Sequence, residues 1–541
     1  MKAFINYINN KLKKYLIIQK YKRFNKLNFP NKGKFNKCVL IEFNAFNESH
    51  ICQSLFANYL SKKYSLSIIG YFNYSILSSP LKRGLLRKLK WFFGSIINYK
   101  NHGIYKSFGT KKIIVPEITE DIKRKAVKKV KKIFKNIKSK KDILNIKVDN
   151  ILIGDLIFDT YIKRNKISQF NFKDEKFNIM VEEFIILFYF WKNYFKYNIV
   201  HSIIGVHSVY SYAIPLRIAI FNNIKAYTIN SRQISKLNSN YLFSGTNFME
   251  YRKKFSELDP KIKRKGISDA KKVILRRLSG KGGIKNHLIS NISSFHSKIL
   301  PKEIIRDEKT NILICTRNVF DAVHVYGNLL FEDNYEWLNF LGKMSEKTNY
   351  NWYLKTHRNF EGKFTLYQPR STELINEIIK KYKQIKILPN DYSHKQIIND
   401  GIDFVLTQHG SVGFEYAYNN VQVINASINN PQIAYSFNHN PKNKKEYEYL
   451  LRNLRKKKKL DIKKKDIYEF YFMRNLYQNK NWLFNNFKMI KNIGGWDKMM
   501  SHEIYEYAVN KISKKKIYKL NKYFSNFETS DYQVNTIEDL I

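Results

Sequence analysis

Five short apolar runs recur between residues 311 and 424, and helical patterns separate them. The runs are residues 311–316, 352–355, 385–388, 404–407 and 421–424. Strands that alternate with helices through short connections favour a doubly wound parallel sheet with helices on both faces. No other feature of the chain constrains the fold as strongly, and it predicts an α/β domain over this stretch.

A second set of runs with the same order lies earlier in the chain. Residues 38–43 and 66–71 are predicted strands, and residues 49–62 between them place Ile51, Leu55 and Phe56 at helical spacing. Strand, helix and strand in this order form a βαβ unit, which implies a parallel sheet with a right-handed crossover. Residues 198–229 repeat the pattern, so this domain is expected to end near residue 240.

The chain has 541 residues, a length at which one hydrophobic core stops growing and chains divide into domains. We therefore predict an α/β protein with two facing Rossmann-like domains. The predicted parts are a basic N-terminal segment (1–35), a first Rossmann-like domain (36–240), a linker region (241–300), a second Rossmann-like domain (301–435) and a basic helical C-terminal extension (436–541).

The formal net charge of +53 at pH 7 raises the question of a polyanionic partner. Most of the 97 basic residues are Lys rather than Arg, whereas base and phosphate recognition in nucleic-acid complexes favours Arg. A nucleic-acid partner is therefore not expected. Two Lys-rich helical faces, residues 121–142 and 452–465, fit either solvated helix surfaces or contacts with anionic lipid headgroups.

The cysteine content and the hydropathy of the sequence indicate the cellular compartment in which the protein works. Cys38, Cys52 and Cys315 are widely spaced, so neither a disulfide framework nor a zinc site is indicated. The most apolar run, residues 184–191, is shorter than the ~20 residues that span a bilayer and is interpreted as a buried helix. Residues 1–21 lack a secretory signal pattern and fit an amphipathic surface helix. We expect a cytoplasmic protein, peripheral on the inner face of the cytoplasmic membrane.

Ligands of open parallel sheets bind beyond the carboxyl ends of the strands, which locates a site in the second predicted domain. Cationic, hydroxyl and glycine residues gather at those ends and suit a phosphate group. They are Arg317, Lys355, His357, Arg358, His409, Gly410, Ser411 and Gly413. Free amides at a helix that begins near Ser411 would add positive charge. Glu415, one turn further, can accept hydrogen bonds from ribose hydroxyls; alternatively, Ser411 is only a helix cap and Glu415 a solvated residue.

These residues also resemble a known family. The segment 407–417, TQHGSVGFEYA, followed by residues 420–425, resembles a segment of capsule and surface-polysaccharide biosynthesis proteins. Residues 355–358 are similar to an upstream element of the same proteins, although Arg358 and Gln422 stand where that family has proline. Bacterial Kdo transferases and teichoic-acid glycerophosphotransferases belong to this wider group, and their fold of two facing Rossmann-like domains is called GT-B.

The resemblance implies transfer of a sugar from a nucleotide-activated donor to a growing cell-surface glycan. The second domain would then bind the donor, with His357, Ser411 and Glu415 as donor-binding positions, and the first would bind the acceptor. We expect an inverting enzyme without a metal or other cofactor, because no DxD motif stands at a strand end. Two alternatives stay open: a CDP-glycerol-type glycerophosphotransferase, and a nonenzymatic polyanion-binding or assembly protein.

The general base of such a transfer must lie within about 3 Å of the acceptor hydroxyl. The loop after the first strand, residues 44–50, is the expected source, with Glu48 as the first candidate and His50 as the second. Either residue could instead simply begin the following helix, where an acidic group favours the helix dipole. The expected partners are a nucleotide sugar, a glycan or lipid-linked acceptor and an anionic membrane surface.

Overall fold

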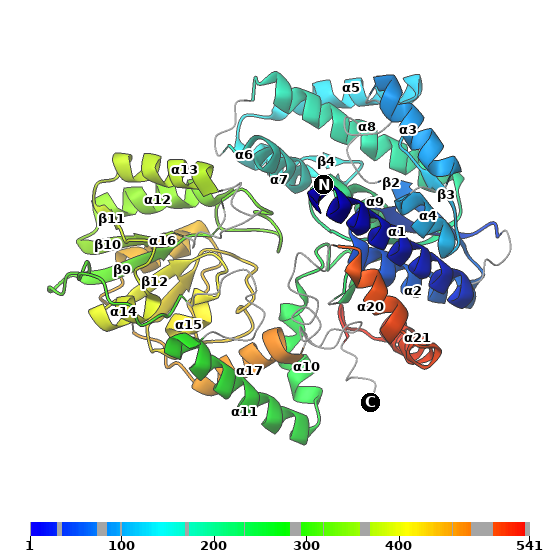
Figure 1. The fold of residues 1–541 in the computed structure, drawn as a ribbon. Coiled ribbons are helices and arrows are strands. Elements are labelled where there is room, and N and C mark those ends of the chain that lie inside the picture. Colours follow the sequence, from blue (N-terminus) through cyan, green and yellow to red (C-terminus); the bar gives the residue numbers. More distant parts are fainter. Residues whose placement is uncertain are drawn as a thin grey trace. The chain divides into compact units, whose positions relative to one another are not determined.

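A computed structural model of the chain divides into two compact units. The first unit consists of residues 1–157, 172–244 and 479–541, and the second of residues 158–171 and 245–478. The structure describes residues 2–29, 35–72, 84–97, 100–167, 172–231, 233–281, 294–317, 319–356, 368–456, 458–477 and 501–535. Each unit contains its own sheet (Figure 1).

The first sheet has six strands. They are β1 (Cys38–Phe43), β2 (Ser67–Phe72), β3 (Thr110–Ile114), β6 (Val200–Gly205), β7 (Lys225–Ile229) and β8 (Ile234–Leu237). Their order is β3-β2-β1-β6-β7-β8, and only β8 runs antiparallel to its neighbour. The chain moves outward from β1 in one direction and from β6 in the other. The topological switch point therefore lies between β1 and β6, where ligands of such sheets bind.

Helices cover both faces of this sheet. They are α1 (Lys2–Asn28), α2 (Asn47–Tyr64), α3 (Gly84–Ile96), α4 (Asn101–Ser107), α5 (Glu120–Asn136), α6 (Lys140–Leu144), α8 (Glu175–Tyr197), α9 (Ile214–Phe221), α20 (Glu503–Lys511) and α21 (Lys514–Thr529). α7 (Gly154–Asn165) begins in the first unit, and from Phe158 onward its residues belong to the second. Beside α7 lies a short hairpin of β4 (Lys147–Val148) and β5 (Ile151–Leu152). One core joins α1, α2, α4, α20 and α21 to the sheet, with Phe56 and Phe524 in edge contact. On the other face Trp191 of α8 meets Tyr71 of β2, so the apolar run 184–191 is the buried helix that the sequence predicts.

The second sheet has five strands, all parallel. They are β9 (Thr310–Cys315), β10 (Tyr350–Lys355), β11 (Ile385–Ile387), β12 (Phe404–Thr407) and β13 (Gln422–Asn425), in the order β11-β10-β9-β12-β13. All five strands predicted from the apolar runs are confirmed. The switch point of this sheet lies between β9 and β12.

The helices of the second unit also lie on both faces of its sheet. They are α10 (Tyr251–Glu257), α11 (Pro260–Arg276), α12 (Asn334–Lys347), α13 (Gln368–Lys381), α14 (His394–Asp400), α15 (Val412–Tyr418), α16 (Lys444–Arg452) and α17 (Lys464–Tyr471). Strand side chains alternate between two cores: Leu313 and Val405 join α11, α15 and α17, whereas Ile312 and Leu406 join α12, α13 and α16. Full burial of each such side chain stabilises the fold by about 1.5–3 kcal/mol.

Two parallel, doubly wound sheets in one chain confirm the predicted α/β class with two Rossmann-like domains. The segments outside the sheets are placed in ways that the sequence pattern did not indicate. Residues 241–300, expected to link the domains, contain α10 and α11, which pack into the core of the second unit. The expected C-terminal extension divides: α16 and α17 belong to the second unit, and α20 and α21 to the first. Among the described helices, none combines the length and the apolar character that crossing a bilayer requires.

Candidate active site

The switch point of the second sheet brings together two predicted site residues. Arg317 follows β9, His409 follows β12, and Nη1 of Arg317 contacts Nε2 of His409. The two residues are 92 positions apart in sequence, and the pairing of β9 with β12 makes them neighbours. The structure therefore places two of the predicted site residues where an open α/β sheet binds its ligand.

Arg317 also fixes the loop that follows β9. Its Nη2 atom donates to the carbonyl oxygens of Asp321 at 2.9 Å and Ala322 at 3.2 Å. Because the guanidinium is planar and rigid, these bonds orient its remaining donors as well as the loop. The sequence indicated Arg317 as a phosphate ligand, and the structure adds this loop-holding role.

His409 is neutral in the folded protein. Burial, together with the charges of Arg317 and Arg474, holds the pKa of His409 well below its ordinary value of 6.5. Its ring meets the edge of Tyr326 at 5.1 Å, and Arg474 donates to the Tyr326 hydroxyl at 3.0 Å. Arg317 therefore contacts the imidazole directly, and Arg474 is linked to it through Tyr326.

Gln408, beside His409, is the least satisfied polar residue of the cluster. Its side chain is 1% exposed, and neither its amide nitrogen nor its amide oxygen has a hydrogen-bond partner among the residues that the structure describes. Leaving a buried amide unsatisfied costs about 1–3 kcal/mol, so such a group in a native fold calls for an explanation. A polar ligand that hydrogen-bonds to the Gln408 amide would explain why this group is buried without a partner.

Lys355 has a different environment from the one expected of a phosphate ligand. The side chain is buried, and its ammonium donates to the carbonyl oxygens of Pro389 at 2.8 Å and Asn390 at 2.6 Å. These bonds hold the loop after β11 against the end of β10. His357 and Arg358, the other two residues predicted on this strand end, lie outside the described residues.

Glu415 is not the solvated helix residue of the alternative interpretation. It is buried, and its Oε1 atom accepts from Nε of Arg277 at 2.5 Å and lies 2.5 Å from Nη2. Burial opposes the charge of Arg277, but Glu415 and Tyr471 outweigh it and raise the pKa of the guanidinium. Oε2 of Glu415 accepts no hydrogen bond from a described residue.

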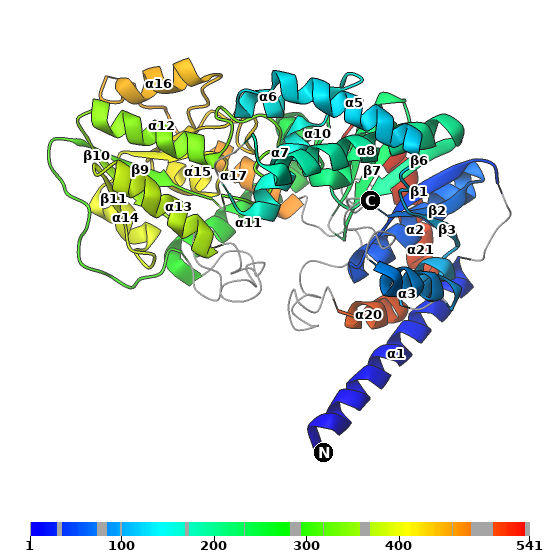
Figure 2. The ribbon, with the colours of Figure 1, turned by 90° about the horizontal axis from the view of Figure 1, so that it is seen from above.

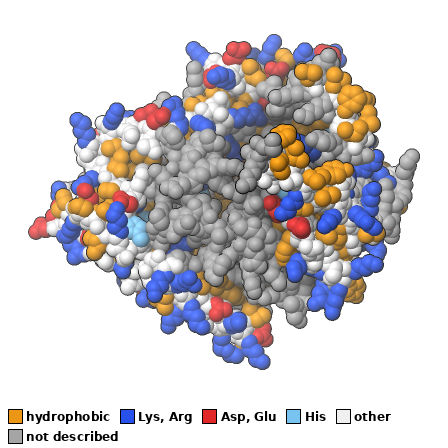
Figure 3. Space-filling model, in the orientation of Figure 1, with side chains coloured by type: hydrophobic (Ala, Val, Ile, Leu, Met, Phe, Trp, Pro, Cys, Tyr) orange, Lys and Arg blue, Asp and Glu red, His pale blue; other side chains and the backbone are white. Residues whose placement is uncertain are grey.

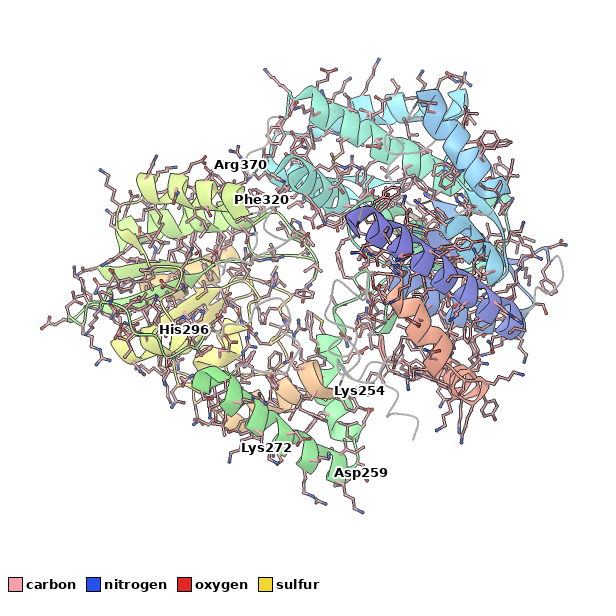
Figure 4. All side chains as sticks on the ribbon, viewed as in Figure 1. Lys254, Asp259, Lys272, His296, Phe320 and Arg370 are labelled. Atoms are coloured by element: carbon pink, nitrogen blue, oxygen red, sulfur yellow. The ribbon has the colours of Figure 1, made fainter. Side chains whose placement is uncertain are left out.

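The position of Arg277 depends on α11. Asp259 begins this helix by accepting a hydrogen bond from the amide of Lys261, and Pro260 occupies its first turn. Figure 4 shows Asp259 at the start of the helix and Lys272 further along it. Arg277 follows directly after the last residue of α11, so the length of the helix determines where the partner of Glu415 lies.

The turn before α15 differs from the expected anion site. α15 has seven residues, and the amides of Gly413, Phe414 and Glu415 are bonded to the carbonyls of Gly410 and Ser411. Few amides are therefore free, contrary to the expectation. The Ser411 side chain is exposed and does not cap the helix. At Gly413 an added Cβ would lie 2.2 Å from Oε1 of buried Gln432, so glycine serves close packing there.

The first unit places Glu48 at the carboxyl edge of its sheet. Glu48 lies in the first turn of α2, and its Oε2 accepts from the hydroxyl of Ser231, which follows β7, at 2.5 Å. His207, which follows β6, contacts Phe46 edge-on at 5.9 Å. Glu48 is only partly buried. The carboxylate is thus beside the switch point between β1 and β6.

His50, the second base candidate, is held inside the first unit. Its side chain is 0% exposed, and burial lowers its pKa to about 4. Nδ1 lies 2.6 Å from the Tyr505 hydroxyl, and Nε2 lies 3.0 Å from the carbonyl oxygen of Asn44. The carbonyl can only accept, so Nε2 carries the proton, and the Tyr505 hydroxyl beside Nδ1 also donates to Oδ1 of Asn47 at 2.9 Å. Both nitrogens are engaged, and the arrangement joins α2 to α20.

Some residues at these sites were not found from the sequence. Arg277, Tyr326 and Arg474 come from elements far from the strand ends that they approach, so no local motif indicates them.

Two cavities lie elsewhere. One of about 620 Å³ is at the amino ends of β2 and β3, and one of about 170 Å³ includes Phe320 and Arg370, which lie close together in Figure 4. In the described parts of the chain, no three His, Cys, Asp or Glu side chains form a metal-binding group.

No protein-family model matches this chain, and no curated protein matches it. Similar solved structures include a beta-Kdo 2,4 transferase (KpsC) of Thermosulfurimonas dismutans, with 13% identity over 50% of this chain and 79% of the other, and a TM-score of 0.30. A UDP-GlcNAc 2-epimerase of Neisseria meningitidis is 9% identical over 81% of this chain and 97% of its own, with a TM-score of 0.24. A Rickettsia africae glycosyltransferase is 10% identical over 92% and 100%, with a TM-score of 0.24. Scores this low carry no argument about function.

Proposed function

We propose that this chain is a glycosyltransferase that moves a sugar from a nucleotide-activated donor to a cell-surface glycan. The observation that carries the proposal is the cluster at the second switch point: Arg317 contacts His409 directly, Arg474 is linked to His409 through Tyr326, and the unsatisfied Gln408 directly precedes His409 in the chain. Two fixed guanidinium groups stabilise the charge that develops on a departing nucleotide phosphate, because they are oriented before the reaction begins.

The remaining donor contacts follow from the same edge of the sheet. Glu415, oriented by Arg277, accepts a hydrogen bond from a ribose hydroxyl through Oε2, and the exposed hydroxyl of Ser411 lies four residues before it. His357 and Arg358 stay predicted phosphate ligands. The close packing of Gly410 and Gly413 sets the path of the backbone between His409 and Glu415.

On the acceptor side we propose Glu48 as the general base. Its carboxylate is partly accessible and is oriented by the Ser231 hydroxyl, whereas His50 has both ring nitrogens bonded within the fold. Removal of the proton from the acceptor hydroxyl by a positioned carboxylate contributes about 10²–10⁴-fold to the rate. Direct attack on the donor gives inversion, and independence of a divalent metal stays part of the proposal.

The test is a transfer assay with the purified chain. Nucleotide sugars that raise the melting temperature are selected first, since a ligand that binds only the folded state stabilises it. Each is then incubated with a lipid-linked glycan acceptor, with and without EDTA, and the mass of the product is measured by mass spectrometry. An added sugar residue supports the proposal. An added glycerol phosphate from CDP-glycerol would assign the alternative reaction, and binding without any transfer would point to a nonenzymatic protein.

A further inference from the structure

Two helices of the first unit expose apolar faces. In the first half of α1 these side chains are 47–66% exposed: Phe4, Ile5, Tyr7, Ile8, Leu12, Tyr15 and Leu16. On α3 and the residue after it they are 41–83% exposed: Leu86, Leu89, Phe92, Phe93, Ile96 and Ile97. Contiguous exposed patches of this kind mark sites of interaction on soluble domains.

The apolar residues form stripes rather than scattered positions. At 100° per residue, all the exposed apolar side chains of α1 except Tyr7 lie within about a third of the helix circumference, and those of α3 within about 140°. Each helix is anchored by residues outside its stripe. Tyr21 of α1 stacks on Tyr505 at 4.5 Å, and Trp91 of α3 meets Phe43 edge-on at 5.5 Å.

The two helices lie on the same side of the first unit. Figure 2 shows α1 running out of the unit on the side where α3 lies. In Figure 3 apolar side chains gather over both helices. The second half of α1 is fixed by Ile17 and Tyr21, which are buried, whereas its first half extends beyond the body of the unit.

The charge of these helices identifies the occupant. Neither α1 nor α3 contains an Asp or a Glu. Their basic residues are Lys2, Lys11, Lys13, Lys14, Lys20, Lys22, Arg23 and Lys26 on α1, and Arg87, Lys88 and Lys90 on α3. A second copy of the chain docked on the same helices would bring these cations together with no carboxylate on either helix to offset them. An anionic lipid surface offers both an apolar layer and negative charge.

We propose that α1 and α3 form the membrane-docking surface of this protein, with their apolar stripes inserted among the acyl chains of an anionic bilayer. The aromatic rings of Phe4, Tyr15 and Phe92 suit the boundary between headgroups and chains. The proposal does not depend on the proposed enzymatic function. It also locates the contact away from the Lys-rich faces predicted from the sequence, since α5 packs its apolar residues Ile122 and Ile133 inward.

The test is flotation of the full chain with vesicles of phosphatidylcholine alone or with phosphatidylglycerol. Ile8→Glu/Leu12→Glu on α1 and Leu89→Glu/Phe93→Glu on α3 each place carboxylates in a stripe. We expect wild-type partitioning onto anionic vesicles, and for each double variant a partition coefficient lower by roughly tenfold or more. Ile299→Glu/Ile305→Glu is the matched control, because it makes the same chemical change at exposed positions of the second unit. It should bind like the wild type.

Three results would overturn the proposal. The wild type could fail to bind anionic vesicles at low salt. The control could lose as much binding as the stripe variants, which would show that vesicle binding depends on the net charge of the protein and not on the apolar stripes. Finally, light scattering could show that the stripe variants dissociate a dimer while vesicle binding is unchanged, and the occupant would then be a second copy. Circular dichroism and melting temperature establish that each variant is folded before it is scored.

Discussion

The switch points of the two sheets have the same topology and opposite chemistry. In the first unit the residues after β1, β6 and β7 bring a carboxylate, Glu48, to the sheet edge beside the hydroxyl of Ser231. In the second unit the residues after β9 and β12 bring Arg317 and His409 together, and Arg474 joins them through Tyr326. Chemistry in such folds is set by the loops that the strands present. Under the proposed function, the first unit would abstract the proton and the second would bind the phosphate.

The sharpest way to break this comparison is to neutralise the first switch point. Glu48→Gln keeps the size of the side chain and removes the base, so transfer should fall by about 10²–10⁴-fold while donor affinity is unchanged. Steady-state kinetics and donor titration measure the two effects separately. Ser231→Ala is the control, because it leaves the carboxylate in place and should cost less than about tenfold. Wild-type turnover by Glu48→Gln would remove the first unit's catalytic role.

In the second unit, substitutions of the Glu415–Arg277 pair distinguish an effect on folding stability from an effect on donor binding. Arg277→Met leaves a buried carboxylate without its partner and should lower the free energy of unfolding by about 3–5 kcal/mol. Arg277→Met/Glu415→Leu should recover most of that loss. If Glu415 holds the donor ribose, the double variant will nevertheless show a raised donor KM with little change in kcat. A stable double variant with wild-type KM would show that the pair is purely structural.

Buried His50 predicts an acid-sensitive first unit. Folded His50 stays neutral down to about pH 4, whereas an unfolded histidine takes up a proton near pH 6.5. Between these values the unfolded state binds more protons, so the free energy of unfolding falls as pH is lowered, by about 3 kcal/mol in total. Urea unfolding of His50→Gln and wild type at pH 7 and pH 4.5 measures this. An equal acid loss in both proteins would contradict the assignment.

Substitution of Gln408 is expected to have the smallest effect, and to change stability and nucleotide affinity in opposite directions. Gln408→Met removes an unsatisfied buried amide, so stability without ligand should rise by about 1–3 kcal/mol while nucleotide affinity falls by roughly tenfold. Gln396→Met is the matched control: its amide is bonded to both backbone atoms of Leu300, at 3.0 and 2.8 Å, so the change should destabilise and leave affinity alone. A less stable Gln408→Met would mean that the amide is satisfied by the fold.

The strands and the strand-end residues could be predicted from the sequence, because apolar runs and short connections are local signals. Arg317 and His409 were found in this way, since parallel strands carry successive ends to one edge. Their partners could not be found. Arg474 follows α17, which packs on α11 and α15 from a distant part of the chain, and Arg277 depends on the end of α11. Glu48 and His50 are two positions apart in the same predicted loop, and the burial of His50 against Tyr505 of α20 distinguishes them only in the structure.

The central claim is that the second switch point binds the phosphates of a nucleotide donor. Calorimetric titration of nucleoside mono- and diphosphates into wild type, Arg474→Met and Arg452→Met tests it most directly. Arg452 is exposed and paired with Glu448, so its variant controls for the loss of one charge. We predict saturable binding to the wild type and to Arg452→Met, and a Kd roughly 10- to 150-fold higher for Arg474→Met. Equal affinity in all three proteins, or no binding to any, would contradict the account.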